Sequence, residues 1–181
     1  TAAAQAGELG VPGDPALVPS EFRPVVEGIN RTLDQVVAPL RVSADCVARI
    51  ARGDIPEPLR VEFRGDFAAL RDNLNDLIGT NRALLAEMAR MAEAQSAGDT
   101  EARVDQARFE GAFQALASGV NSCAAQYAAV LGEVLDILGR YGAGDFTPEL
   151  RPLPGKLARA NQGLDLLRQN LRAVAGDVTA L

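Results

Sequence analysis

The chain has 181 residues, 48% of them hydrophobic and 23% charged, so it can form a buried core and is too apolar for wholesale disorder. Its formal net charge is −6 and histidine is absent, which argues against binding to nucleic acid and removes the most common metal ligand and general base. We therefore expect no enzyme activity, no nucleic-acid binding, and no cofactor, metal or small-molecule ligand.

Four helices are predicted in chain order, because apolar residues recur at alternating spacings of three and four within residues 22–50, 67–95, 113–141 and 157–181. This spacing is typical of a coiled-coil seam rather than of the broader apolar stripe of a globular helix. At about 1.5 Å per residue, a run of roughly 30 residues forms a helix of roughly 45–50 Å. The predicted coiled-coil core consists of Phe22, Ile29, Phe67, Leu70, Leu74, Leu77, Met88, Phe113, Val120, Tyr127, Val134, Ile137, Leu157 and Leu164.

The first helix contains two prolines with different expected consequences. Pro24 lies in its first turn, where a missing N–H costs little. Pro39 falls in the middle, where we expect it to kink the helix or to mark a joint between two units.

Three connectors separate the helices, at residues 53–65, 98–111 and 144–155, and the prolines of the first and third predict extended backbone. About 12 extended residues reach ~40 Å, enough to run back along a half-helix of ~24 Å. Each helix is therefore expected to run parallel to the half-helix before it. The apolar residues expected to anchor the connectors on the helices are Leu9, Ile55, Leu59, Phe146 and Leu150.

The connectors belong to a fourfold repeat. A glycine followed by an acidic residue recurs at intervals of 46, 45 and 46 residues, as Gly7-Glu8, Gly53-Asp54, Gly98-Asp99 and Gly144-Asp145. A second landmark follows 11 to 13 residues later, at Ser20, Gly65, Gly111 and Gly155. Ten residues beyond it come Asn30, Asn75, Asn121 and Asp165. We expect the first glycine of each repeat to end a helix in the left-handed conformation.

Alternate repeats also resemble each other. Gly28-Ile29-Asn30 is similar to Gly119-Val120-Asn121, which lies 91 residues later. We therefore expect neighbouring units to differ systematically.

The two cysteines, Cys46 and Cys123, lie far apart and form no metal-binding or redox motif, so we interpret both as buried apolar side chains. No apolar run approaches the ~20 residues of a membrane-spanning helix. No signal peptide is recognised at the start of the chain. We expect a cytoplasmic location and, because the first residue is Thr1, a piece of a longer protein.

Four motifs carry a resemblance to a known family: Gly53-Asp54-Ile55-Pro56, Arg64-Gly65-Asp66-Phe67, Asn73-Leu74-Asn75, and Asn30-Arg31-Thr32-Leu33-Asp34 leading to Pro39-Leu40. Together with the repeat they resemble the HAMP domain, the linker module of histidine kinases, adenylate cyclases and methyl-accepting chemotaxis receptors. The closest likeness is to concatenated poly-HAMP arrays of soluble chemoreceptor-like transducers. The expected units are a partial one at 1–38, complete ones at 39–80 and 81–126, and a last one at 127–181 that includes the start of an output helix.

The resemblance implies an all-α fold in which two copies form parallel four-helix coiled-coil units, stacked end to end and sharing long continuous helices. It implies a signal relay, in which helix rotation or bundle repacking passes between a sensor and an output domain. The implied partners are a second copy and those adjacent domains. The residues expected to form the signal-relay connectors are Gly53, Asp54, Ile55, Gly65, Gly98, Gly111, Gly144, Phe146 and Gly155.

The chain departs from the family pattern at the acidic residue that usually lies two positions before the second glycine. Phe63, Phe109 and Leu153 occupy this position, and Ser20 replaces the glycine itself in the first unit. Two other functions remain open: a static coiled-coil scaffold, and a monomeric helical bundle that binds a hydrophobic partner.

Overall fold

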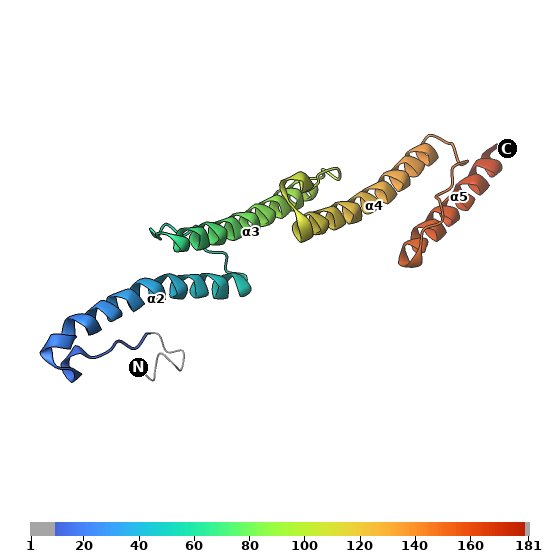
Figure 1. The fold of residues 1–181 in the computed structure, drawn as a ribbon. Helices are drawn as coiled ribbons and strands as arrows, with labels where there is room; N and C mark the ends of the chain where they lie inside the picture. The colour runs from blue at the N-terminus through green and yellow to red at the C-terminus, as the bar shows by residue number, and fades with distance from the viewer. Residues whose placement is uncertain (1–9, 180–181) are drawn as a thin grey trace. The chain divides into compact units, whose positions relative to one another are not determined.

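The computed structural model describes residues 10–179, and its regular structure there is entirely helical (Figure 1). The four long helices are α2 (Arg23–Ala51), α3 (Asp66–Ser96), α4 (Gly111–Gly142) and α5 (Ala158–Thr179). Four short 3-10 turns accompany them, namely η1 (Pro15–Leu17), η2 (Ser20–Phe22), η3 (Gln106–Arg108) and η4 (Gly155–Leu157). The predicted all-α class and all four helices are confirmed, whereas Gly7, Glu8, Leu9 and Leu181 lie outside the described residues.

The first three long helices end in the same hydrogen-bonded turn. At the end of α2, the amide of Gly53 donates to the carbonyl of Ile50 and the amide of Asp54 to that of Arg49. This is the Schellman motif, which requires a left-handed residue, and Gly53 has a φ of 82°. The equivalent glycines, Gly98 and Gly144, have φ values of 96° and 85°. The predicted helix stops are therefore confirmed.

The second landmark also has a left-handed backbone in the three repeats where it is a glycine. Gly65, Gly111 and Gly155 have φ values of 57°, 54° and 57°, and each lies where a connector turns into the next helix. Sequence spacing marked these positions but did not predict their conformation. A residue with a Cβ would be strained there, which explains why glycine recurs.

Pro39 does not end a helix, because α2 continues through it from Arg23 to Ala51. Proline has no N–H to donate to the preceding turn. The Ser43 hydroxyl donates to the Pro39 carbonyl oxygen at 2.8 Å, and both residues are buried. The predicted joint is therefore not a break in the helix.

The chain divides into two compact parts, Thr1–Ala86 and Glu87–Leu181. The core of the first part is formed by Cys46 of α2 and Leu74 and Ile78 of α3. The half-buried apolar residues packed on it are Ile50, Ile55, Leu59 and Leu70. The division falls inside α3, and the finer boundaries at 38, 80 and 126 stay predictions.

Hydrogen bonds of the first connector fix the relative direction of α2 and α3. Glu57 pairs with Arg82, whereas Leu59, further along the connector, bonds Asn75, which is earlier in α3. The connector therefore runs antiparallel to α3 and back along α2, so the two helices are parallel, as Figure 1 also shows. The predicted return connector and parallel helix pair are confirmed here.

The second part repeats this arrangement. Its core consists of Ile137 and Tyr141 of α4, Leu150 and Leu153 of the connector, and Leu164 of α5. The Tyr141 hydroxyl donates to the carbonyl of Pro148 at 2.9 Å, and further along the connector the amide of Arg151 donates to Glu133, which is earlier in α4. The connector therefore runs back along α4.

Candidate functional site: helix–connector contacts

An asparagine side chain holds the connector of the first part against the helix that follows it. The Asn75 Oδ1 accepts from the backbone N–H of Leu59 at 2.6 Å, and its Nδ2 donates to the Leu59 carbonyl oxygen at 3.1 Å. We call this arrangement the asparagine clamp. An amide suits the position because it carries both a donor and an acceptor. The same two bonds, 2.7 to 2.9 Å long, join Asn30 with Gly13 and Asn121 with Val104.

The last repeat makes its clamp with a different residue from the predicted landmark. Asn161 accepts from the amide of Leu153 at 3.0 Å and donates to the carbonyls of Leu150 and Arg151 at 3.0 and 2.8 Å. Asp165, the landmark in the sequence, instead accepts from Arg168. An ionised carboxylate cannot donate to a carbonyl, whereas an asparagine four residues earlier lies on the same helix face.

The residues that depart from the family pattern form part of the apolar core. Phe63, Phe109 and Leu153 are 9%, 3% and 6% exposed, respectively, so each is buried where an acidic side chain was expected. Ile55 and Phe146, two of the predicted anchors, pack against the cores of their own parts. Apolar burial therefore holds the connectors near their start as well as near their end.

A glutamate in the preceding helix adds a second polar contact in two repeats. Glu87, eleven residues before Gly98, accepts from the amide of Asp105 at 3.3 Å. Glu133, eleven residues before Gly144, accepts in the same way from the amide of Arg151 at 3.2 Å. The matching position before Gly53 is Val42, which has no acceptor in its side chain. We call this contact the glutamate latch.

Glu87 is the more enclosed of the two latch residues. Its side chain is 10% exposed, against 32% for that of Glu133. Arg90 donates to Glu87 through Nε and a terminal nitrogen at 3.2 and 2.8 Å, and Arg108 donates at 2.6 Å. The hydrogen bonds from Arg90 and from the Asp105 amide hold the pKa of Glu87 below its ordinary value.

Ion pairs confirm that alternate repeats are alike. Arg49 pairs with Asp54 and Arg140 with Asp145, and both positions of the second pair lie 91 residues after those of the first. Two further connector glutamates pair with an arginine seven residues after a clamp asparagine, namely Glu57 with Arg82 and Glu149 with Arg168. The first three of these pairs are exposed, so each contributes little to stability, whereas the Arg168 side chain is largely buried.

Among these acidic residues, Asp145 has the most strongly shifted pKa. The Thr147 hydroxyl and amide donate to its Oδ1, and Arg140 donates to its Oδ2. Together they lower the pKa of Asp145 from 3.8 to about 2, with the Thr147 hydroxyl the largest cause. Asp145 directly follows the left-handed Gly144, so this network fixes the start of the connector.

The repeating clamp, the return connectors and the parallel helix pairs can now be compared with known families. Residues 19–83 match the family model of the HAMP domain, and residues 130–172 match that of HAMP N-terminal domain 3. The chain therefore contains HAMP domains. The two matched ranges contain the clamp asparagines Asn30, Asn75 and Asn161, and the resemblance predicted from the sequence is confirmed.

A chemoreceptor is among the relatives of this HAMP chain. Methyl-accepting chemotaxis protein McpB of Pseudomonas aeruginosa is 29% identical over 150 residues, which make up 81% of this chain and 22% of McpB. The chain therefore spans about a fifth of that relative's length. The HAMP matches and this similarity support a poly-HAMP signal transducer.

The predicted HAMP core residues differ in exposure on the single chain. Buried ones are Leu74, Ile137 and Leu164. Half-buried ones are Phe67, Leu70, Met88, Phe113, Val120 and Val134, and exposed ones are Phe22, Ile29, Leu77, Tyr127 and Leu157. Their place in the core of an assembled HAMP dimer stays a prediction.

A second apolar stripe, which the predicted core does not include, lies beside the buried one on α4 and on α2. On α4, Val130, Val134 and Ile137 belong to the core of the second part. The residues one position later are exposed at 46%, 58% and 39%, and they are Leu131, Leu135 and Leu138. We call this exposed stripe and its equivalents the outer seam. On α2 the outer seam consists of Val36, Leu40 and Val47.

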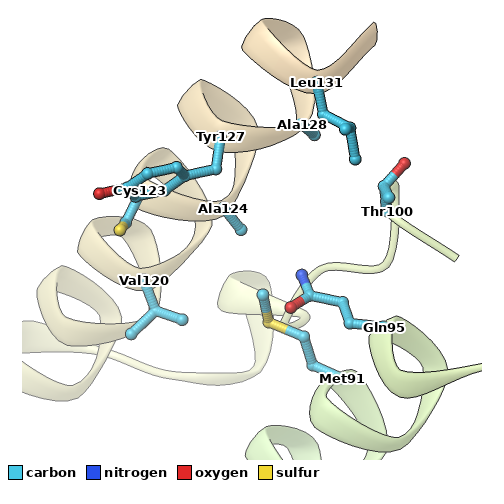
Figure 2. Close-up of a pocket in the computed structure, with 9 residues that line it drawn as sticks. All are labelled: Met91, Gln95, Thr100, Val120, Cys123, Ala124, Tyr127, Ala128 and Leu131. Carbon is cyan, nitrogen blue, oxygen red and sulfur yellow. The ribbon is translucent and has the colours of Figure 1, made fainter. Parts of the chain in front are cut away.

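An apolar groove of about 430 Å³ lies between α3 and α4 in the second part of the chain (Figure 2). Met91 and Gln95 of α3 face Val120 and Tyr127 of α4 across it. Cys123 also lines the groove and is exposed, so its predicted burial is wrong for the single chain, whereas Cys46 is buried as predicted.

Residues 10–179 contain neither a membrane-spanning helix nor a cluster of metal-ligating side chains. No helix in this range has the length and apolarity to cross a membrane. No group of three or more cysteine, aspartate or glutamate side chains within it could hold a metal ion.

Proposed function

We propose that this chain relays conformational change between a sensor and an output domain of a chemoreceptor-like protein, as a parallel homodimer. The observation that carries the proposal is a set of clamped, parallel helix pairs whose outer seams are exposed in the part of the chain that the structure describes. One copy supplies two helices to each unit, and a second copy would complete a four-helix bundle.

The outer seam supports the homodimer. On α4 it repeats at spacings of four and three, which is the spacing of a helix-packing seam. Contiguous exposed apolar patches are rare on monomeric proteins and mark interaction surfaces. A second copy carries the same stripe at the same height, so a parallel arrangement buries leucine against leucine in a self-complementary interface.

Helix α3 supports the relay. Its first half contributes Leu74 and Ile78 to the core of the first part, and its second half holds the glutamate latch of the second part. The helix is continuous from Asp66 to Ser96. A rotation of its first half would therefore change the packing presented by its second half, without any ligand between them.

Insertions into α3 of the full-length protein test the relay. One alanine inserted after Ala86 rotates the following helix by ~100°, whereas seven rotate it by ~700°, which is close to two full turns. We expect the first insertion to change the output activity strongly and the second to leave it near that of the wild type. Equal outputs for both would support a static scaffold instead.

The sensor, the output domain and a cytoplasmic location are part of the same proposal. They are supported by the similarity to McpB, a methyl-accepting chemotaxis protein. A 19 kDa monomer that retains its helices would support the remaining alternative, a monomeric bundle that binds a hydrophobic partner in the groove.

A further inference from the structure

The repeats share the asparagine clamp but differ in the glutamate latch. They differ in how many connector residues the latch glutamate holds. The latch is absent before Gly53, where Val42 stands. Glu133 holds a single connector residue, Arg151, through its amide and its guanidinium. Glu87 holds two connector residues directly, the amide of Asp105 and the guanidinium of Arg108.

Arg90 extends the contact of Glu87 to a third connector residue. The Nη2 of Arg90 donates both to Glu87 and to the carbonyl oxygen of Arg103, the latter at 2.5 Å. The matching positions of the other repeats, eight residues before the glycine, are Asp45 and Asp136, which cannot donate in this way. The complete network therefore occurs in one repeat of the described chain.

The position of Glu87 makes its hydrogen bonds stronger than those of a surface ion pair. Its side chain is nine-tenths buried, so water competes weakly for its oxygens. Charge-assisted hydrogen bonds are about twice as strong as neutral ones. By contrast, in the Glu57–Arg82 pair of the first complete unit, the side chain of Glu57 is 75% exposed and that of Arg82 is 39% exposed.

We propose that Glu87 is a positioning residue that fixes the connector of residues 97–110 on the helices. This connector is then the last of the three to detach from its helices. The connector of residues 52–65, which lacks the latch, is the first. The unit around Glu87 is then the stiff element of the array. This consequence for signalling rests on the proposed function, but the order of release does not.

Hydrogen exchange of the 181-residue chain, measured by mass spectrometry as protection factors of connector peptides, tests the proposal. We expect Glu87→Gln to lower protection in residues 97–110 by about tenfold or more, because a charged acceptor of several donors is lost. We expect no change in the other two connectors. Glu93→Gln is the matched control, because Glu93 lies on the same helix with an exposed side chain that makes no hydrogen bond or ion pair.

A transplanted latch tests the same idea in the opposite direction. Val42→Glu places a carboxylate at the position equivalent to Glu87, with the amide of Arg60 at the equivalent distance along the connector. We expect it to raise protection in residues 52–65. Glu133→Gln should lower protection in residues 143–157 by less than Glu87→Gln does in its own connector.

A pH profile distinguishes positioning from packing. In the wild type, protection of residues 97–110, corrected for intrinsic exchange, should fall as Glu87 becomes protonated at acid pH. The charged groups that face Glu87 are the guanidinium groups of Arg90 and Arg108. In Glu87→Gln this step should be absent. Unchanged protection in Glu87→Gln, or a loss spread equally over all connectors, would overturn the proposal, whatever the outcome of the α3 insertions.

Discussion

The Asn75 side chain makes both hydrogen bonds of the Leu59 backbone, sixteen residues away along the chain. This pairing replaces a strand partner, because the extended connector has no neighbouring strand to satisfy its polar groups. The Asn75 side chain supplies the hydrogen-bond donor and acceptor that a neighbouring strand would supply. This one residue therefore sets the register between the connector and the helix.

Asn75→Asp should destabilise the chain, because the carboxylate keeps the acceptor but places a negative charge against the Leu59 carbonyl. We expect a loss of about 1–3 kcal/mol in the free energy of unfolding, the cost of unmaking partly buried hydrogen bonds. Denaturant unfolding followed by circular dichroism measures it. Asn73→Asp is the control, since Asn73 is exposed two residues away. Equal losses in both variants would refute the clamp.

The last repeat offers a test in which sequence and structure disagree. Asn161→Asp should cost about 1–3 kcal/mol of unfolding free energy, as in Asn75→Asp. Asp165→Asn makes the repeat look more like its neighbours, yet it should change stability by less than about 0.5 kcal/mol, because it alters only the pair with Arg168, in which the Asp165 side chain is 50% exposed. Unfolding midpoints of the two variants decide which residue makes the clamp.

Asp145 predicts a specific acid dependence. Its pKa is lowered from 3.8 to about 2, so its contribution is fully present above pH 3.8 and is lost as the pH falls toward 2. In Asp145→Asn, the thermal midpoint should lose less between pH 4 and pH 2 than in the wild type. Asp136→Asn, an exposed change on α4, should keep the wild-type profile. A wild-type profile in Asp145→Asn would contradict the assignment.

Ile55→Asp should release its connector while leaving the helices formed, because Ile55 packs on the core of Cys46, Leu74 and Ile78. Burying a carboxylate there without a partner is unfavourable, so the connector detaches. Hydrogen exchange in residues 52–65 should rise, with the helical circular dichroism signal nearly unchanged. Val61→Asp, an exposed change in the same connector, is the control. Global unfolding by Ile55→Asp alone would contradict a separable connector.

Phe146→Asp makes the equivalent test in the second part. Phe146 packs on the core there and lies edge-on to Tyr141, with ring centroids 6.1 Å apart. We expect increased exchange in residues 143–157 and retained helicity. In the full-length protein the same variant should shift output activity, and an unchanged output would remove the connector from the relay.

Helices and connectors could be predicted from the sequence because their signals are local. Left-handed glycines such as Gly53, and heptad spacing, mark ends and faces within a few residues. The exposed stripe of α4 was not predicted, because Leu135 is as apolar as Val134 and only packing gives the two residues different surroundings. The sequence does contain a signal for the glutamate latch, since Glu87 and Glu133 both lie eleven residues before a repeat glycine.

The fourth clamp shows where the repeat pattern fails. Counting from the landmark glycine led to Asp165, whereas the chemistry of the contact needs an amide and uses Asn161. A search for a donor and acceptor on the same helix face, rather than for the same offset, identifies it.

Disulfide cross-linking of a Leu135→Cys variant, with Cys46 and Cys123 replaced by alanine and serine, tests the parallel homodimer most directly. In a parallel dimer the two copies of residue 135 meet across the symmetry axis, so mild oxidation should give a covalent species near 38 kDa, twice 19.0 kDa. A cysteine at Asp136, off the seam, should cross-link poorly. A 19 kDa monomer by light scattering, with no cross-linking at residue 135, would contradict the account.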